Sequence, residues 1–180
     1  METGSAIGVT LVRELGLAAA SVIDRVHAAK VPIVAAGRIT RRLESVGLPE
    51  KLARDLDHPR YAEVAQRCLA CTNCTQVCPT CFCNTIEDFT ELDGTGAERR
   101  RRWDSCFTSD FSYIHGGPVR PSTRARYRQW ITHKLSTWHR QFGSSGCVGC
   151  GRCITWCPTG IDITEEAAHI ASARKPEKAS

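Results

Sequence analysis

Apolar residues recur at helical spacing along the first third of the chain. Their three- and four-residue intervals predict an amphipathic helix that continues to about Lys30. Pro32 is expected to end this helix, because proline has no amide hydrogen to donate. A second amphipathic helix is predicted over 33–46, and Pro49 is expected to open a further short helical turn. No chemical motif accompanies this pattern, so we interpret residues 1–58 as a helical N-terminal extension.

Helical patterns also flank the middle of the chain. Pro59, at a first helical position, predicts a short helix over 60–66. The clearest pattern predicts one long helix over 122–142, ended by Gly143. Its apolar stripe consists of Tyr127, Trp130, Ile131, Leu135, Trp138 and Phe142. Thr164 is expected to cap a short last helix, and no segment clearly indicates a strand. We therefore predict a mainly α-helical protein.

Two cysteine runs with identical spacing interrupt these helices. The first, C-L-A-C-T-N-C-T-Q-V-C-P, ends at Pro79, and the second, C-V-G-C-G-R-C-I-T-W-C-P, ends at Pro158. Each run places three cysteines at two-residue gaps, which wraps three thiolates around one side of a [4Fe–4S] cube. The fourth cysteine points away from that cube and, by the general rule for paired runs, binds the other cluster. Two [4Fe–4S] clusters are therefore expected.

The predicted ligands exchange between the two runs. One cluster is expected to be held by Cys68, Cys71, Cys74 and Cys157. The other is expected to be held by Cys78, Cys147, Cys150 and Cys153. In the second loop, Gly149 and Gly151 allow the backbone to approach its cube closely.

Other uses of the cysteines fit the pattern less well. A disulfide framework is disfavoured because the eleven cysteines are odd in number and occur in C-x2-C spacings. Zinc sites use two C-x2-C pairs separated by a longer gap, whereas each run here has three cysteines within seven residues.

Three cysteines remain outside the two predicted clusters: Cys81, Cys83 and Cys106. They can be buried or loop thiols, or ligands of a third metal site together with another donor such as His115. Cys81 also forms a C-x2-C pair with Cys78 and could replace it as a ligand, although Pro79 favours Cys78.

Charge and composition limit the remaining function classes. The net charge is +5, and two clusters with negative charge would cancel most of it. The basic run Glu98–Arg102 is interpreted first as a solvated face and second as a surface for an acidic partner. Nucleic-acid binding is disfavoured, because no recognition-helix or stacking pattern accompanies the run. No signal peptide or membrane span is indicated, so a cytoplasmic location is expected.

Clusters with four cysteine ligands have no open position for a substrate, so electron transfer is the expected role. The chain has no G-x-G-x-x-G, no P-loop, no haem-attachment motif and no nucleophile–base pair. We therefore expect no catalysis by this chain alone and no binding of nicotinamide or flavin. An electron relay needs a donor and an acceptor on partner chains.

The text around the runs resembles a known family. The segments are D-H-P-R-Y-A-E-V-A-Q-R-C, V-C-P-T-C-F-C, R-R-W-D-S-C-F, F-S-Y-I-H-G-G-P-V-R-P-S-T-R-A-R-Y-R-Q-W and S-G-C-V-G-C-G-R-C-I-T-W-C-P-T-G-I-D-I-T-E-E. They are similar to the beta, iron–sulfur subunit of soluble sulfhydrogenases, which are nickel–iron hydrogenases, and to the iron–sulfur subunit of anaerobic sulfite reductases. The long gap between the runs also resembles the helical two-cluster ferredoxin modules of heterodisulfide reductases and succinate dehydrogenases.

This resemblance implies an α-helical ferredoxin-like module over residues 59–172, followed by a flexible tail at 173–180. It implies electron transfer between a flavoprotein that binds NAD(P) and the catalytic metal subunit of a hydrogenase or sulfite reductase. The family has a much longer N-terminal domain, so we interpret the chain as a short variant or a fragment, in which residues 1–58 are a helical extension or a truncated domain. Two alternatives stay open: a free-standing ferredoxin-like carrier and an iron–sulfur redox sensor that binds nucleic acid.

Overall fold

The computed structural model describes residues 14–16 and 18–172. The predicted tail at 173–180 and the start of the first predicted helix lie outside these residues. The chain divides into two compact units, Met1–Arg42 and Leu43–Ser180. Residues 43–58, which the sequence interpretation assigned to the N-terminal extension, belong to the second unit.

Among the described residues of the first unit, one helix dominates, α2 (Val22–Arg38). Ser21 and Asp24 cap it reciprocally: the Ser21 hydroxyl accepts from the Asp24 amide at 3.1 Å, and Asp24 accepts from the Ser21 amide at 2.9 Å. The expectation that Pro32 ends a helix was wrong, because α2 continues through this residue. The helix predicted over 33–46 is absent, since regular structure stops at Arg38.

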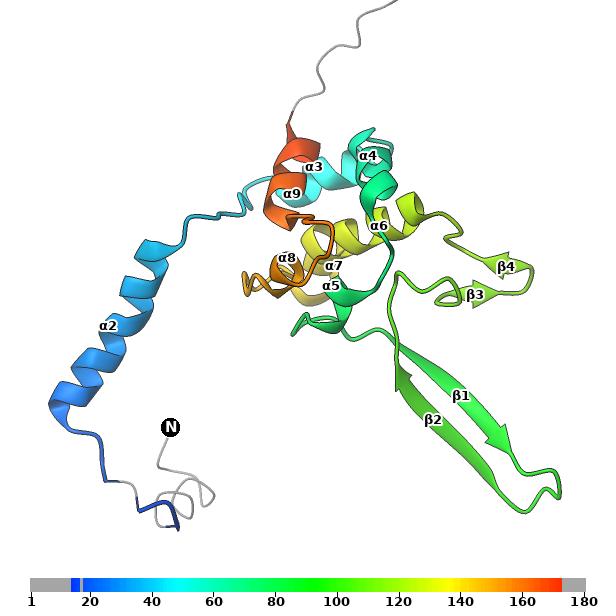
Figure 1. The fold of residues 1–180 in the computed structure, drawn as a ribbon, viewed down its shortest axis with the longest axis horizontal. Helices are drawn as coiled ribbons and strands as arrows, with labels where there is room; N and C mark the ends of the chain where they lie inside the picture. Colours follow the sequence, from blue (N-terminus) through cyan, green and yellow to red (C-terminus); the bar gives the residue numbers. More distant parts are fainter. Residues whose placement is uncertain (1–13, 17, 173–180) are drawn as a thin grey trace, which may run out of the picture. The chain divides into compact units, whose positions relative to one another are not determined.

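The second unit contains helices α3 (Leu48–Arg54), α4 (Arg60–Arg67), α5 (Asn73–Gln76), α6 (Thr123–Thr132), the π-helix η1 (His133–Thr137), α7 (Trp138–Phe142), α8 (Arg152–Thr155) and α9 (Ile163–Ala171) (Figure 1). The elements α6, η1 and α7 follow one another without a break, which confirms the long helix predicted over 122–142. Ser122 caps its start and Gly143, in the left-handed conformation, ends it. For α9, the capping residue is Asp162 rather than the predicted Thr164.

The core of the second unit lies where α3 and α4 pack against the long helix and α9 packs against α3 and α4. Its buried aromatic centre comprises Tyr61, Tyr127, Trp130 and Phe107, and the ring centroids of neighbouring members lie 5.7–6.3 Å apart. Such tilted and edge-on contacts favour aromatic packing beyond the burial of apolar area. The core therefore fixes the position of the long helix, and side chains of this helix lie near the cysteines.

The expectation that the chain has no strands was wrong. Strands β1 (Asn84–Thr90) and β2 (Ala97–Trp103) form an antiparallel hairpin that extends from the helices, and β3 (Tyr113–Ile114) pairs with β4 (Gly117–Pro118) (Figure 1). The hairpin pairs acidic with basic side chains, as in Arg99–Asp88 at 2.7 Å and Arg102–Glu87 at 2.6 Å. The basic run is thus an exposed strand whose charges are partly compensated within the hairpin.

No helix in the described part of the chain is long and apolar enough to cross a membrane.

A buried carboxylate ties α9 to α4. The side chain of Glu166 is 1% exposed and accepts hydrogen bonds from Arg60 Nε at 2.6 Å and Arg60 Nη2 at 3.1 Å, while Arg67 binds the same carboxylate. These bonds to Glu166 raise the pKa of Arg60. A buried carboxylate is costly unless its oxygens are paired, and here both oxygens of Glu166 have arginine partners.

We predict that Glu166→Gln lowers the free energy of unfolding by about 2–3 kcal/mol, because both arginines lose a charged partner in a buried setting. Urea denaturation under anaerobic conditions measures this change. Asp88→Asn removes an ion pair on the exposed hairpin and is the matched control, for which little change is expected. Equal loss of stability in both variants would contradict the importance of burial at Glu166.

Candidate metal centre

The two cysteine runs fold into the same backbone shape. Ala70 and Thr72 in the first run have positive φ angles of 51° and 68°, and Gly149 and Gly151 occupy the same places in the second with 69° and 70°. Glycine adopts this left-handed conformation without steric cost, whereas alanine and threonine do not. The sequence interpretation gave close approach to the cube as the reason for the two glycines. The structure adds a second reason, because the turn requires a left-handed residue at each of these positions.

Each turn is followed by a single helical turn that carries the third cysteine. Thr72 O accepts from the Thr75 amide at 2.9 Å, and Gly151 O accepts from the Ile154 amide at 3.1 Å. These short helices, α5 and α8, lie side by side (Figure 1), and Asn73 Nδ2 donates to Trp156 O at 3.2 Å. The contact brings the first run against the end of the second.

One set of thiols lines a common cavity, whose walls include Cys68, Cys71, Cys74, Cys153 and Cys157. Burial, followed by the charges of its cysteine neighbours, raises the pKa of Cys74. Those neighbours include Cys157, which belongs to the other run. The structure therefore gathers all four cysteines predicted for one cluster.

The second predicted set is also gathered. Burial, followed by the charges of Cys147, Cys78 and Cys150, raises the pKa of Cys153 to about 11. Cys78 is thus the residue of the first run that lies near this set. Since Cys74 and Cys153 also influence one another, the two sets are neighbours.

The fourth cysteine of each run is followed by proline and threonine, and the threonine hydroxyl contacts the thiol. The distances are 3.2 Å for Cys78 Sγ to Thr80 Oγ1 and 3.5 Å for Cys157 Sγ to Thr159 Oγ1. Cys157 also accepts from the Ile161 amide at 3.3 Å. Burial opposes ionisation of Cys157, but these hydrogen bonds outweigh it and its pKa is lowered.

Cys78 has a further neighbour, which is a buried lysine. Lys134, 4% exposed, places Nζ 3.2 Å from Cys78 Sγ, 3.1 Å from Thr80 Oγ1 and 3.3 Å from Gly146 O. Its ammonium also lies over the ring of Trp138, 5.4 Å from the centroid. None of these four groups is a carboxylate, so the nearest anion available to Lys134 is a thiolate.

Cys78 and Lys134 each stabilise the charged form of the other. A hydrogen bond from Cys81, with contributions from Thr80 and Lys134, lowers the pKa of Cys78 to about 4. Burial acts to lower the pKa of Lys134, but the charges of Cys81 and Cys78 outweigh it and the pKa is raised. A thiolate is the form that binds a metal, so the surroundings of Cys78 suit a ligand.

The chain matches the family model described as the 4Fe-4S dicluster domain over residues 67–161. It belongs to the 4Fe-4S dicluster domain family. The matched range begins one residue before Cys68 and extends past Cys157, so this dicluster domain contains both cysteine runs and everything between them.

The chain is also similar to a curated relative. This relative is sulfhydrogenase 2 subunit beta of Pyrococcus furiosus, which is 35% identical over 123 residues. These residues make up 68% of this chain but 36% of the relative, so the chain spans about a third of that protein's length. No solved structure matches the chain.

The residues of the dicluster domain fit iron–sulfur clusters. The cavity of the first set is walled by Leu69, Phe107 and Trp130 besides its thiols, which limits the access of water. Within the described residues, no three His, Cys, Asp or Glu side chains converge closely enough to hold a single metal ion. The thiols instead surround a space, as ligands of a cluster with several irons do.

Lys134 is a site residue that the sequence interpretation missed. It lies four residues after Trp130 and four before Trp138, in the middle of the apolar stripe of the long helix. A cation on an otherwise apolar face needs a buried anion, and this was the available signal. The π-helical turn η1 begins one residue before it, and such turns often occur at functional sites.

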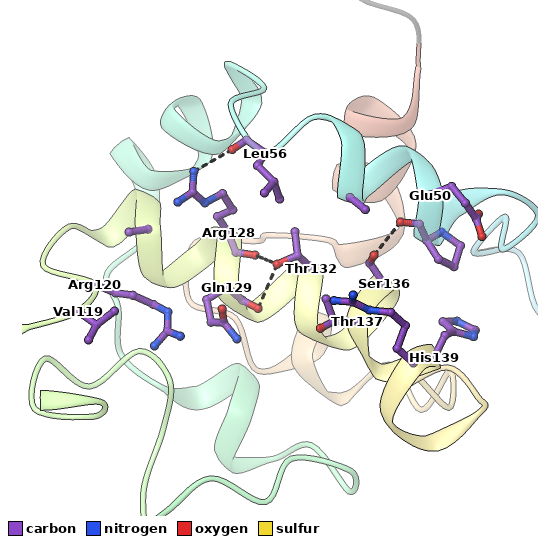
Figure 2. A pocket seen from close by; sticks show the side chains of 14 residues that line it. Glu50, Leu56, Val119, Arg120, Arg128, Gln129, Thr132, Ser136, Thr137 and His139 are labelled. Carbon is purple, nitrogen blue, oxygen red and sulfur yellow. Dashed lines mark hydrogen bonds between the residues drawn. The ribbon is translucent and has the colours of Figure 1, made fainter. Parts of the chain in front are cut away.

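A separate cavity beside the long helix lies away from the thiols. It measures about 830 Å³, and Figure 2 shows Arg120, Arg128 and His139 among its lining residues. Hydrogen bonds at its walls join α3 to the long helix, as in Ser136 Oγ to Pro49 O at 2.7 Å. No cysteine lines this cavity, so it is separate from the metal centre.

Proposed function

We propose that this chain is an iron–sulfur electron-transfer subunit that relays electrons through two [4Fe–4S] clusters. Its ligands are the exchanged sets Cys68, Cys71, Cys74 and Cys157, and Cys78, Cys147, Cys150 and Cys153. When bound, such clusters accept and release single electrons. The observation that supports the proposal is that Cys157 of the second run lines the cavity of Cys68, Cys71 and Cys74, while Cys78 of the first run lies near Cys153.

The exposure of the thiols supports a relay. Cys71 and Cys150, the second cysteine of each run, are exposed, whereas Cys74 is half-buried between the sets. A path can therefore enter at one surface thiol, cross where Cys74 and Cys153 lie near one another, and leave at the other. The chain's own part is to hold the ligands, donate hydrogen bonds to the thiolates and keep water from the space between them.

The partners that we propose are a flavoprotein that binds NAD(P) and the catalytic metal subunit of a cytoplasmic hydrogenase or sulfite or sulfur reductase. The similarity to a sulfhydrogenase beta subunit supports this assignment. Exposed apolar side chains also border the surface thiols: Leu69 is 66% exposed, Val148 63% and Trp156 60%. Exposed apolar residues of this kind are typical of the centre of a protein–protein interface, where charged residues are depleted.

The ligand exchange is tested by Cys74→Ser. We expect this variant to lose about four iron atoms per chain, because a serine hydroxyl is a poor replacement for a thiolate ligand. Iron and acid-labile sulfide are counted after anaerobic purification, and EPR of the reduced protein shows which signal is missing.

Cys157→Ser provides the matched comparison, since it removes the ligand that the other run supplies to the same cluster. Loss of the same EPR signal in both variants supports the exchange. If Cys157→Ser instead removes the signal that Cys147→Ser removes, each run holds its own cluster and the exchange is wrong.

We predict that Lys134→Met lowers the reduction equilibrium constant of the cluster that Cys78 completes by at least tenfold, or about 59 mV for one electron. The reason is that Lys134 places a positive charge 3.2 Å from Cys78, which favours the added negative charge of the reduced state. A redox titration followed by EPR measures the midpoint potential, and the signal is assigned by its absence in Cys147→Ser.

Lys134→Arg keeps the charge and should recover part of the shift. Arg140→Met removes a charge from an exposed position of α7 and is the control for a general electrostatic effect. A midpoint potential that is the same in Lys134→Met and in the unmodified protein would contradict a direct role of this ammonium.

The proposed role within a larger complex predicts stable association. The chain, tagged and purified anaerobically from its own host, is expected to bring with it a flavoprotein and a chain that contains nickel–iron or sirohaem. Metal analysis and the flavin spectrum of the purified complex identify these partners. A monomer that exchanges electrons equally well with unrelated reductases would support the free-standing carrier instead.

A further inference from the structure

Three cysteines are left outside the proposed clusters, and the structure brings them together. Cys81, Cys83 and Cys106 line one cavity, although Cys106 is separated from the others by the whole β1–β2 hairpin. His115, considered from sequence as a further ligand, lies exposed in the turn between β3 and β4 and does not line this cavity. The imidazole at the cavity wall belongs to His133, whose Nε2 lies 2.8 Å from Gln141 Oε1.

The hairpin explains how the three thiols meet. The register pairs Asn84, which follows Cys83, with Trp103, and the pairing continues as the Asp104 amide donates to Cys83 O at 2.9 Å. The next residue, Ser105, is fully buried, and its Oγ lies 2.6 Å from Thr75 Oγ1 in α5. The chain on both sides of the cavity is therefore anchored, and one anchor is the helix that carries Cys74.

The gathered thiols lie beside both proposed cluster sets. A hydrogen bond with Cys83, followed by burial, raises the pKa of Cys106, and the charges of Cys83, Cys81 and Cys74 raise it as well, so that Cys74 is a neighbour of Cys106. Cys81 donates a hydrogen bond to Cys78, and that bond, followed by burial, raises the pKa of Cys81. One end of the trio thus approaches a ligand of the first set, and the other end approaches a ligand of the second.

The cavity resembles the one lined by the first cluster set. Both have a volume of about 30 Å³, and both combine thiols with aromatic walls, here Phe82, Trp130 and Trp138. Lys134 also lines the cavity and supplies the positive charge that an anionic centre needs. As in the two motif sets, the described side chains do not converge tightly enough for a single ion, which favours a cluster over zinc.

We propose that Cys81, Cys83 and Cys106 hold a third [4Fe–4S] cluster, beside the two clusters of the paired runs. Binding releases the three thiol protons. Three protein thiolates leave one iron of a cube without a cysteine, so this centre can accept a ligand that a fully coordinated cluster cannot. The site goes beyond the proposed relay, because the relay needs only the eight cysteines of the two runs.

Anaerobically purified full-length chain, with iron and acid-labile sulfide counted, tests the proposal. We expect about twelve irons per chain, and about eight in the variant Cys81→Ser/Cys83→Ser/Cys106→Ser, a loss of about one third. EPR of the reduced variant should retain the signals that Cys74→Ser and Cys147→Ser each remove. If the triple variant does not fold, the single variant Cys106→Ser is used in its place, because it changes only one wall of the cavity. This variant should lose the same third signal.

Several results would overturn the third cluster. These are a count of about eight irons in the unmodified chain, one zinc per chain that disappears in the triple variant, or a Cys83–Cys106 disulfide detected by intact mass without reductant. A count of eight that falls to four in Cys74→Ser would reject the third cluster and leave the two-cluster relay intact. Failure of the relay would instead appear as an unchanged iron count in Cys74→Ser.

Discussion

The contact of Lys134 with both cysteine runs is the interaction on which the metal centre depends. Its ammonium touches Cys78 and Thr80 of the first run and Gly146 O at the entrance to the second. A buried ammonium is costly unless its hydrogens find acceptors, so the charge holds these segments together. Gly146 is required for the approach, because a Cβ there would lie 2.8 Å from Lys134 O and 2.6 Å from the ring of Trp138.

The rest of the second unit serves to place this lysine and the two runs. The aromatic core and α3 hold the long helix, and its π-helical turn rotates the residues that follow Thr132. The buried Glu166 fixes α9, which follows the second run, to α4, which precedes the first. The two runs are therefore clamped at their outer ends by an ion pair and at their facing ends by Lys134.

The cysteines and the long helix were predictable because their signals are strict. A repeated cysteine spacing that ends in C-P fits few kinds of site, and an apolar stripe from Tyr127 to Phe142 indicates a helix despite local exceptions. The hairpin was missed because the basic run Glu98–Arg102 was interpreted apart from the acidic residues at 87–93. Taken together, they are complementary runs joined through Asp93-Gly94, a dipeptide that favours hairpin turns. Lys134 was missed because its neighbours in the stripe suggested only core packing.

The two runs share one shape but differ in what that shape costs. The left-handed positions hold glycine in the second run, while Ala70 and Thr72 in the first adopt them at about 1–2 kcal/mol each. Without its metal, the first loop lowers its free energy by leaving the left-handed conformation. The second loop has no such strain to relieve and remains closer to its binding geometry. Assembly should therefore be ordered: the glycine loop captures its cluster first, and the first loop closes late and is the first to open when oxygen damages the protein.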